Sequence, residues 1–228
     1  RARKRLFELE QLDQNKVRVK KDNGQQVAYS QAKLENTWAI AAKGLEQTCT
    51  FEELINVFNI TLTDGLDTSQ ILQNLRKAAL DLISVENANW QLVAGRLFTV
   101  EFYKKACRSR KLQMQDIYSP EAWMVHLDDY IQKGLYSSKF KEAYTDEQLL
   151  KAGSWIDKQR DMEYGYTTTL AFAKRYLLNP NKKFHELPQE MYLAVALFLA
   201  IPEKPEQRMQ VARQIYEEAL HVDSYSCM

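Results

Sequence analysis

The sequence contains little glycine and proline, with seven and five among 228 residues. That scarcity excludes collagen-like chains and low-complexity disordered chains. No run of 18 or more apolar residues occurs, and a helix that crosses a bilayer would need one. No apolar signal core lies near the start either. We therefore expect a globular chain that makes no use of a membrane.

Cysteine and histidine are also scarce, with three of each. Because the cysteines are odd in number, far apart and free of any C-x-x-C pair, we expect neither a disulfide framework nor a zinc site. This usage favours a reducing, cytoplasmic compartment. We interpret the histidines as surface or capping residues rather than metal ligands. The six residues are Cys49, Cys107, Cys227, His126, His185 and His221.

The chain lacks an excess of either charge, since its formal net charge is +1. It therefore has no overall field that would attract nucleic acid or an anionic membrane. Its one dense basic block, at residues 1–5, is a solvated tail or a weak contact for a polyanion. Hydrophobic residues make up 45% of the sequence, which supports one large or two small domains.

A β-hairpin is predicted near the start. Val17 and Val19 alternate with basic residues, and Val27 and Tyr29 alternate again after a turn at residues 22–24. An alternation of period two is typical of half-buried strands. The turn residues Asp-Asn-Gly accept the positive φ that a tight hairpin needs.

Four helices follow the hairpin in the predicted first domain. Ser30 is the expected N-cap of the first, which ends at Gly44. Thr50 and Glu53 form a capping box that begins the second. Thr68 or Ser69 caps the third, and the fourth runs over about residues 88–107. The first half is thus ββαααα, a small hairpin on a compact set of helices.

The second half is predicted to be entirely helical. A polar stretch, "RSRKLQMQ", marks a domain boundary between about residues 107 and 114. Beyond it no strand pattern occurs. Helical patterns cover residues 120–133, 145–155, 166–178, 186–200 and 204–221. The fold class is therefore mainly α, with residues 1–14 as a charged lead, 15–107 as the hairpin domain and 108–228 as the helical domain.

The common catalytic and nucleotide-binding motifs are missing. The sequence contains no G-x-G-x-x-G after a strand, no G-x-x-x-x-G-K-[ST] and no H-E-x-x-H. The scattered histidines offer no base for a nucleophile. We interpret the acidic pairs Asp128-Asp129 and Glu52-Glu53 as solvated helix faces. The aromatic residues at helical spacing are interpreted as core: Trp90, Phe98, Phe102, Trp123 and Trp155.

Lysines are the remaining candidates for function. Lys20 and Lys21 lie at the hairpin tip, Lys33 lies early in the first helix, and Lys104-Lys105 lies late in the fourth. If the fourth helix packs near the hairpin, these cations converge, and helix N-termini add amides that bind phosphate. The charge pattern alone leaves two interpretations open: a solvated surface or a phosphate pocket.

Several sequence stretches resemble a known family. The "VKKDNG" turn is followed by Lys33 nine residues after Gly24, as in the ATP-cone. "DGLDTSQILQNLRKAALDLIS" and "NWQLVAGRLFTVEFYKKA" resemble the third and fourth helices of that module. Later, "WIDKQRDMEYGYTTTLAFAKRYLL" and "ELPQEMYLAVALFLAIPEKPEQRMQVARQIYEEAL" are similar to the helical region of the class I ribonucleotide reductase large subunit. "RDM" and "P-Q-x-x-Y-x-x-V-A" are the most specific words, and the resemblance covers about residues 16–221.

The resemblance implies nucleotide-binding positions. Lysines would hold phosphates as point charges. A threonine would hydrogen-bond the nucleotide, and two apolar residues would cover the adenine. The lysines are Lys21, Lys33 and Lys104, the threonine is Thr68, and the apolar residues are Val19 and Leu34.

Four positions depart from the family pattern. Asp22 stands where an arginine is usual, and Val27 stands where a glutamate is common. Leu72 and Glu101 replace histidines near the sugar and the phosphates. An anion near bound phosphates weakens binding by roughly 1 kcal/mol or more per contact if it is partly desolvated.

The implied function is regulatory. ATP or dATP, with Mg²⁺ as an optional companion of the nucleotide, would act as allosteric effector of a ribonucleoside-diphosphate reductase. The partners would be the small, radical-generating subunit and other large subunits. The catalytic barrel lies outside this chain, so we expect no turnover by the chain alone and assign no catalytic residue. Cys227 arrives too early in the sequence to be the family's redox cysteine.

Two further hypotheses belong to other functional classes. In the first, the cone no longer binds nucleotide and acts only as a scaffold for subunit contact. In the second, the chain is a cone-bearing transcriptional regulator. We rank this last because the sequence has no zinc ribbon and no basic stripe along one helix.

Overall fold

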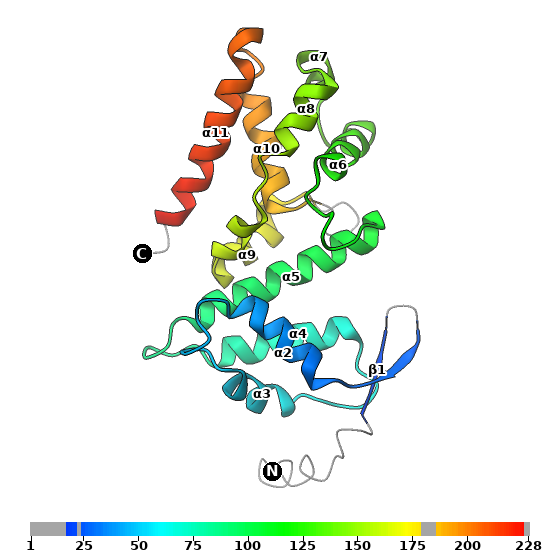
Figure 1. Ribbon diagram of the computed structural model, residues 1–228, viewed down its shortest axis with the longest axis vertical. Coiled ribbons are helices and arrows are strands. Elements are labelled where there is room, and N and C mark those ends of the chain that lie inside the picture. Colours follow the sequence, from blue (N-terminus) through cyan, green and yellow to red (C-terminus); the bar gives the residue numbers. More distant parts are fainter. Residues whose placement is uncertain (1–16, 22–23, 179–185, 226–228) are drawn as a thin grey trace. The chain divides into compact units, whose positions relative to one another are not determined.

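The structure is a computed structural model that describes residues 17–21, 24–178 and 186–225, with side chains described up to residue 219. The chain forms two compact units (Figure 1). The first comprises the chain up to Glu101 together with Gly165–Thr169, and the second comprises Phe102–Tyr164 and the chain from Leu170 onward. The predicted domain boundary at residues 107 and 108 falls inside one continuous helix, and it remains a prediction.

The first unit begins with the predicted hairpin. Strand β1 (Arg18–Lys20) pairs antiparallel with β2 (Gln26–Ala28), and Val19 lies opposite Val27. Gly24 in the turn has a φ of +81°, a conformation that glycine adopts without steric cost. Val19 is 5% exposed, so the alternating pattern does place one face of the hairpin against the core.

Helices α2 (Gln31–Ala41), α3 (Phe51–Asn59), α4 (Thr68–Asp81) and α5 (Trp90–Arg110) follow, as predicted. The capping box at the start of α3 is confirmed, since the Thr50 hydroxyl accepts from the Glu53 amide and the Glu53 carboxylate accepts from the Thr50 amide. Ser30 is the N-cap residue of α2, as predicted, although its hydroxyl accepts from no helix amide. The prediction for α4 was wrong, because its N-cap is Asp67 and Thr68 is already helical.

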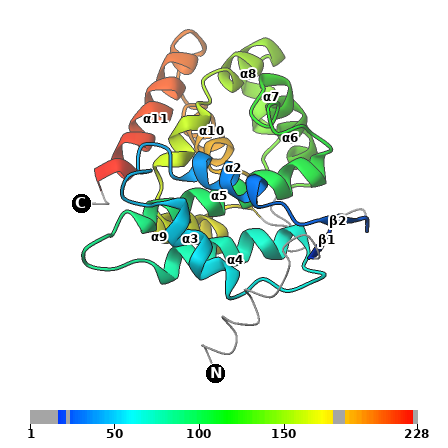
Figure 2. The ribbon, with the colours of Figure 1, turned by 60° about the horizontal axis from the view of Figure 1, so that its bottom comes forward.

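The helices of the first unit share a hydrophobic core, and an arginine of α5 caps the C-terminal end of α2. Leu54, Phe58 and Leu75 are fully buried. The end of α2 is fastened to α5, because Arg96 Nη1 donates to the carbonyl oxygens of Ala41, at 2.9 Å, and of residue 43, at 2.7 Å. Figure 2 shows α2, α3 and α4 together, with the hairpin at one end of the group. This arrangement holds α2 and α4 with their N-terminal ends toward the hairpin.

The second unit is helical, as predicted. Its main helices are α6 (Pro120–Gln132), α8 (Asp146–Gly153), α10 (Pro188–Leu199) and α11 (Pro205–Tyr225). Helix α9 (Tyr166–Ala171), whose residues up to Thr169 belong to the first unit, leads into a π-helical turn, η3 (Phe172–Tyr176). Two short elements had no prediction, α7 (Lys139–Ala143) and the 3-10 helix η2 (Lys158–Glu163). No strand occurs among the described residues from 102 onward.

Helices α6, α8, α10 and α11 enclose the core of the second unit. Trp123, Leu127 and Leu197 are fully buried there. The predicted core role of the aromatic residues is confirmed, with Trp155 packed at the edge of this cluster. The interpretation of His126 as a surface or capping residue is wrong, since it is 3% exposed. His185, the His221 side chain and Cys227 lie outside the described residues.

Candidate functional site

The hairpin lies against the segment that leads into α4. The Arg18 amide donates to Asp64 Oδ1 at 2.7 Å, and the Gly65 amide donates to the Arg18 carbonyl oxygen at 2.9 Å. The Lys20 amide donates to the Leu66 carbonyl oxygen at 3.0 Å. A parallel bridge then pairs Lys20 with residue 67, directly before α4. The tip of β1 and the N-terminus of α4 are therefore neighbours.

This contact brings together three of the six predicted site residues. Val19 and Lys21 lie at the end of β1, and Thr68 is the first residue of α4. Val19 is buried, Thr68 is half-buried and the Lys21 side chain is exposed. An apolar wall, a hydroxyl and an ammonium group thus lie at one edge of the unit, which is the chemistry that a nucleotide needs.

The first turn of α2 carries two more predicted residues, Lys33 and Leu34. Leu34 is 7% exposed, whereas the Lys33 side chain is exposed. The chain just before this helix is held to the hairpin, because the Tyr29 amide donates to the Val17 carbonyl oxygen at 2.9 Å. The sixth residue, Lys104, lies partly buried on the portion of α5 that belongs to the second unit.

The N-termini of α2 and α4 suit an anion. Neither helix has an acidic residue in its first turn, although the N-cap of α4 is the acidic residue Asp67. Unpaired amides and the positive end of the helix dipole attract phosphate at such positions. The exposed ammonium groups of Lys21 and Lys33 add two full charges to this edge.

The departures from the family pattern have a structural context. Val27 is half-buried on β2, Leu72 is 4% exposed on α4, and Asp22 lies outside the described residues. Glu101 is 4% exposed, and its Oε2 lies 3.0 Å from Nη1 of Arg76. The buried anion is therefore compensated by a cation that the sequence reasoning missed.

Helical spacing was the signal that could have identified Arg76. Thr68, Leu72 and Arg76 are four residues apart, so they form one stripe along α4. The Arg76 guanidinium carbon lies 3.9 Å from the centre of the Phe98 ring. Arginine commonly stacks on an aromatic face in this way, which fixes its plane.

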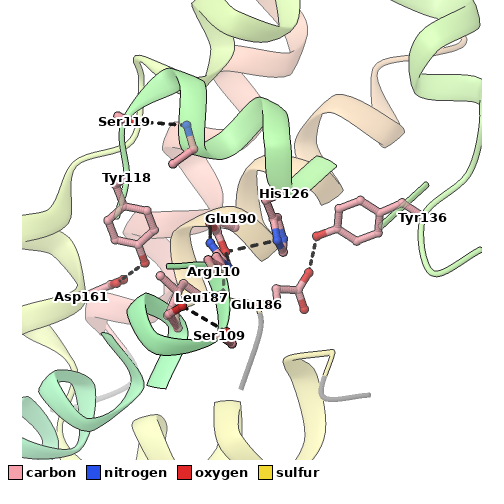
Figure 3. A network of polar contacts seen from close by, with 12 residues as sticks. Ser109, Arg110, Tyr118, Ser119, His126, Tyr136, Asp161, Glu186, Leu187 and Glu190 are labelled. Carbon is pink, nitrogen blue, oxygen red and sulfur yellow. Dashed lines mark hydrogen bonds and ion pairs between the residues drawn. The ribbon is translucent and has the colours of Figure 1, made fainter. Parts of the chain in front are cut away.

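A second polar cluster lies inside the second unit (Figure 3). Arg110 at the end of α5 donates to both carboxylate oxygens of Glu190, at 2.5 and 2.8 Å. Glu190 Oε2 also accepts from the Leu187 amide at 2.9 Å and lies 3.6 Å from His126 Nε2. Glu190 is fully buried, so this two-point ion pair is what makes its charge tolerable in the core.

Asp161 is the centre of a neighbouring set of hydrogen bonds. Tyr118 and Tyr103 donate to its Oδ2 at 2.5 and 2.7 Å, and Gln189 donates to Oδ1 at 2.9 Å. Gln189 in turn accepts from Tyr216 at 2.6 Å. Burial raises the pKa of Asp161 to about 6, although these hydrogen bonds act to lower it.

Glu186 accepts a third set of hydrogen bonds in the cluster. Tyr136 donates to its Oε1, and the Leu178 amide donates to its Oε2 at 2.6 Å. Burial raises the pKa of Glu186 to about 7, against the opposing effect of these two donors. The sequence words "RDM" and "PQ" supply Asp161 and Gln189, so the hydrogen bond between them joins the two most specific parts of the resemblance.

Beside this cluster lies a pocket of about 410 Å³ between the end of α5 and one face of α6. Arg110, His126, Tyr130 and Lys133 are among its lining residues. The cluster contains no nucleophile with an adjacent base, and its polar groups bind one another. Within the described part of the chain, no set of three or more histidine, cysteine or acidic side chains is arranged to hold a metal ion. We interpret the cluster as a framework that fixes α5, α6 and α10.

Known proteins resemble this chain. Residues 162–221 match the family described as ribonucleotide reductase, all-alpha domain. The ribonucleoside-diphosphate reductase subunit alpha of Synechocystis sp. is 35% identical over 156 residues, which are 68% of this chain and 19% of that protein. Subunit alpha of reductase 1 from Escherichia coli is 27% identical over 208 residues, which are 90% of this chain and 26% of that protein. The Helicobacter pylori subunit alpha is 29% identical over 206 residues, which are 88% of this chain and 24% of that protein.

The chain thus spans about a fifth to a quarter of the length of the curated relatives it matches. Together these relatives cover the hairpin unit and the helical unit. No helix among the described residues is both long enough and apolar enough to cross a bilayer.

Proposed function

The chain belongs to the family of ribonucleotide reductase large subunits, and on that premise we propose that it binds ATP and dATP as an allosteric effector module of a ribonucleoside-diphosphate reductase. The enzyme would reduce ribonucleotides to deoxyribonucleotides in a reducing, cytoplasmic compartment. Its partners would be the small subunit and further large subunits.

One observation supports this proposal most strongly: the attachment of the β1 tip to the N-terminus of α4. The bond from the Lys20 amide to the Leu66 carbonyl oxygen fixes Val19 and Lys21 beside Thr68. The first turns of α2 and α4, which carry no acidic residue, complete the anion-binding edge, and the N-cap of α4 is the acidic residue Asp67. These features are independent of the resemblance, and they suit a molecule with an apolar base and a chain of phosphates.

Each side chain has a defined role in the proposal. Lys21 and Lys33 contact phosphates as mobile point charges, and Lys104 adds a third ammonium group from α5. The amide and hydroxyl of Thr68 donate to the nucleotide. Val19 and Leu34 are buried apolar residues that cover one face of the adenine. Mg²⁺ would arrive with the triphosphate.

Regulation would follow from differential affinity. An effector shifts an equilibrium between two assemblies only to the extent that it binds one of them more tightly. ATP would favour the active assembly of large and small subunits, and dATP would favour the inactive one. By linkage, the assembly would change the affinity for the effector by the same factor.

Isothermal titration calorimetry with ATP and dATP tests the proposal. We expect saturable binding by the chain, weakened about tenfold or more in Lys33→Ala, because one charge-assisted phosphate contact is lost. Lys104→Ala should have a similar effect. Lys43→Ala, near the opposite end of α2, is the control and should bind as the parent does. Binding that is equal in all four proteins would contradict the assignment of these lysines.

A second function is favoured by one observation, the buried carboxylate of Glu101. If that charge prevents nucleotide binding, the first unit serves only as a scaffold for contact between subunits. The same titration separates the two functions, since a scaffold gives no heat beyond dilution with either nucleotide.

A further inference from the structure

Arg76 and Glu101 form an ion pair that two ring systems support. Arg76 Nη1 lies 3.0 Å from Glu101 Oε2, and the side chains are 18% and 5% exposed. The guanidinium carbon lies 3.9 Å from the centre of the Phe98 ring, and that ring stacks on Tyr166 at 5.9 Å. The guanidinium is thus held by a carboxylate at one edge and by an aromatic ring at one face.

The pair lies on the helix face that begins at the proposed nucleotide site. Thr68 and Arg76 are eight residues apart on α4. At a rise of about 1.5 Å per residue, their positions are about 12 Å apart along the helix axis. Leu72 lies between them on the same stripe and is buried. A nucleotide whose phosphates extend from the α4 N-terminus along this stripe would approach Arg76.

The chemistry of Arg76 suits a phosphate. A guanidinium group has five N–H donors in a planar fork that matches both carboxylate and phosphate. Glu101 occupies part of that fork, while 18% of the side chain is accessible to solvent. A carboxylate and a phosphate compete for the same donors, and a second anion nearby repels the first.

We propose that Arg76 is a further phosphate-contacting residue of the effector site and that Glu101 is an internal competitor that lowers the affinity for nucleoside triphosphates. This inference rests on the proposed function, and it concerns the regulation of that same site. Glu101 holds Arg76 when no effector is present. A bound triphosphate shares the guanidinium with Glu101 and is weakened by its charge.

Titration of ATP and dATP into four proteins tests the inference: the parent chain, Glu101→Gln, Arg76→Gln and the double variant. We expect Glu101→Gln to bind about fivefold to tenfold more tightly, because one partly desolvated like charge is removed. Arg76→Gln should bind more weakly than the parent, since it loses the guanidinium and with it the ion pair to Glu101. In the double variant, the gain from Glu101→Gln should be smaller than in the parent background.

Asp81→Asn is the matched control. It removes the same charge from the exposed end of α4 and should leave affinity unchanged. Far-ultraviolet circular dichroism and thermal unfolding of each variant establish that it is folded. If Glu101→Gln does not fold, the comparison of the parent with Arg76→Gln replaces it, because weaker binding by Arg76→Gln is the result expected if the guanidinium contacts phosphate.

The outcomes separate this inference from the proposed function. Equal affinity of parent and Glu101→Gln, or of parent and Arg76→Gln, overturns the inference and leaves the effector function intact. Binding by Glu101→Gln without binding by the parent supports the inference and overturns the function of the natural chain. Absence of binding in every protein overturns both.

Discussion

His126 lies on α6 with 3% of its surface exposed, and its Nε2 is 3.6 Å from a Glu190 oxygen. Its ring lies 3.9 Å from the Tyr130 ring. At the residue scale, the second unit is held together by buried polar side chains. A charged side chain is buried there only beside a partner that compensates its charge. The Arg110–Glu190 pair is the strongest of these contacts, because it is bidentate and fully enclosed on the glutamate side.

Removing one partner of that pair should be costly. Glu190→Gln leaves the Arg110 charge buried without its carboxylate, and we expect the free energy of unfolding to fall by about 3–5 kcal/mol. The double variant Arg110→Met with Glu190→Leu leaves no uncompensated charge and should lose much less. Urea unfolding followed by circular dichroism measures both. Equal losses in the two proteins would show that packing, rather than charge compensation, sets the stability here.

Glu186 should make stability depend on pH. Its pKa is about 7 in the folded protein, against an ordinary value of 4.5, because burial disfavours the charged carboxylate. Between these two values the folded state binds more protons than the unfolded state, so stability is highest below about pH 4.5 and falls as pH rises to about 7. We expect this contribution to be of the order of 3 kcal/mol.

Glu186→Gln tests that dependence, since the amide cannot ionise. Urea unfolding at pH 5, 6, 7 and 8 should show a flatter profile for the variant than for the parent. Glu163→Gln, which changes an exposed acid of the same unit, is the control and should keep the parent profile. Parallel profiles for parent and Glu186→Gln would show that the carboxylate titrates normally.

At the scale of elements, close approach of helices α6 and α8 depends on one glycine. A Cβ atom at Gly153 would lie 2.8 Å from Trp123 Cδ1 and 3.0 Å from the Pro120 Cα. Trp123 is fully buried and Pro120 begins α6, so neither can move freely. Residue 153 is therefore constrained by packing, although its position at the end of α8 would otherwise favour alanine.

Gly153→Ala should destabilise the protein by about 1–3 kcal/mol, the cost of overpacking a close-packed contact. Gly165→Ala is a matched control, because its added Cβ would meet Gln91 at an ordinary distance of 3.6 Å. Thermal unfolding compares the two variants. Greater stability of Gly153→Ala would mean that α6 shifts easily and that helix propensity dominates.

At the scale of the whole molecule, the chain consists of two units that each have a core of their own. The proposed effector edge belongs to the first unit, and the buried polar cluster belongs to the second. Relatives match across both units, and the matched family domain covers residues 162–221. Effector binding should therefore slow amide exchange only near the proposed site, while the whole chain remains folded.

Hydrogen exchange of the whole chain with and without ATP measures that signature. We expect slower exchange of amides at residues 18–21, in the first turn of α2 and in the first turn of α4, because bound phosphate and base restrict their opening. At an ATP concentration of about 100 times Kd, the first unit should gain about 2.7 kcal/mol. Changes confined to α6, α8 and α10 would contradict the assignment of the site.

The sequence by itself determined the local elements and the family. Alternating Val17 and Val19, the turn glycine and the Thr50 capping box depend on neighbours within a few residues, so short-range pattern was enough to predict them. The helix order follows from the same kind of information. The words "RDM" and "PQ" carry the resemblance to the family, and they supply Asp161 and Gln189, whose side chains are hydrogen-bonded in the core.

Only the tertiary structure decided which charges are compensated. Arg76 and Glu101 are 25 positions apart, and Arg110 and Glu190 are joined across 80 positions. Periodicity says which face of a helix is apolar, but it does not say which distant side chain meets a buried polar group. For the same reason His126 appeared to be a surface residue. Burial of a charged group depends on a partner that folding supplies, and no pattern within one helix contains that partner.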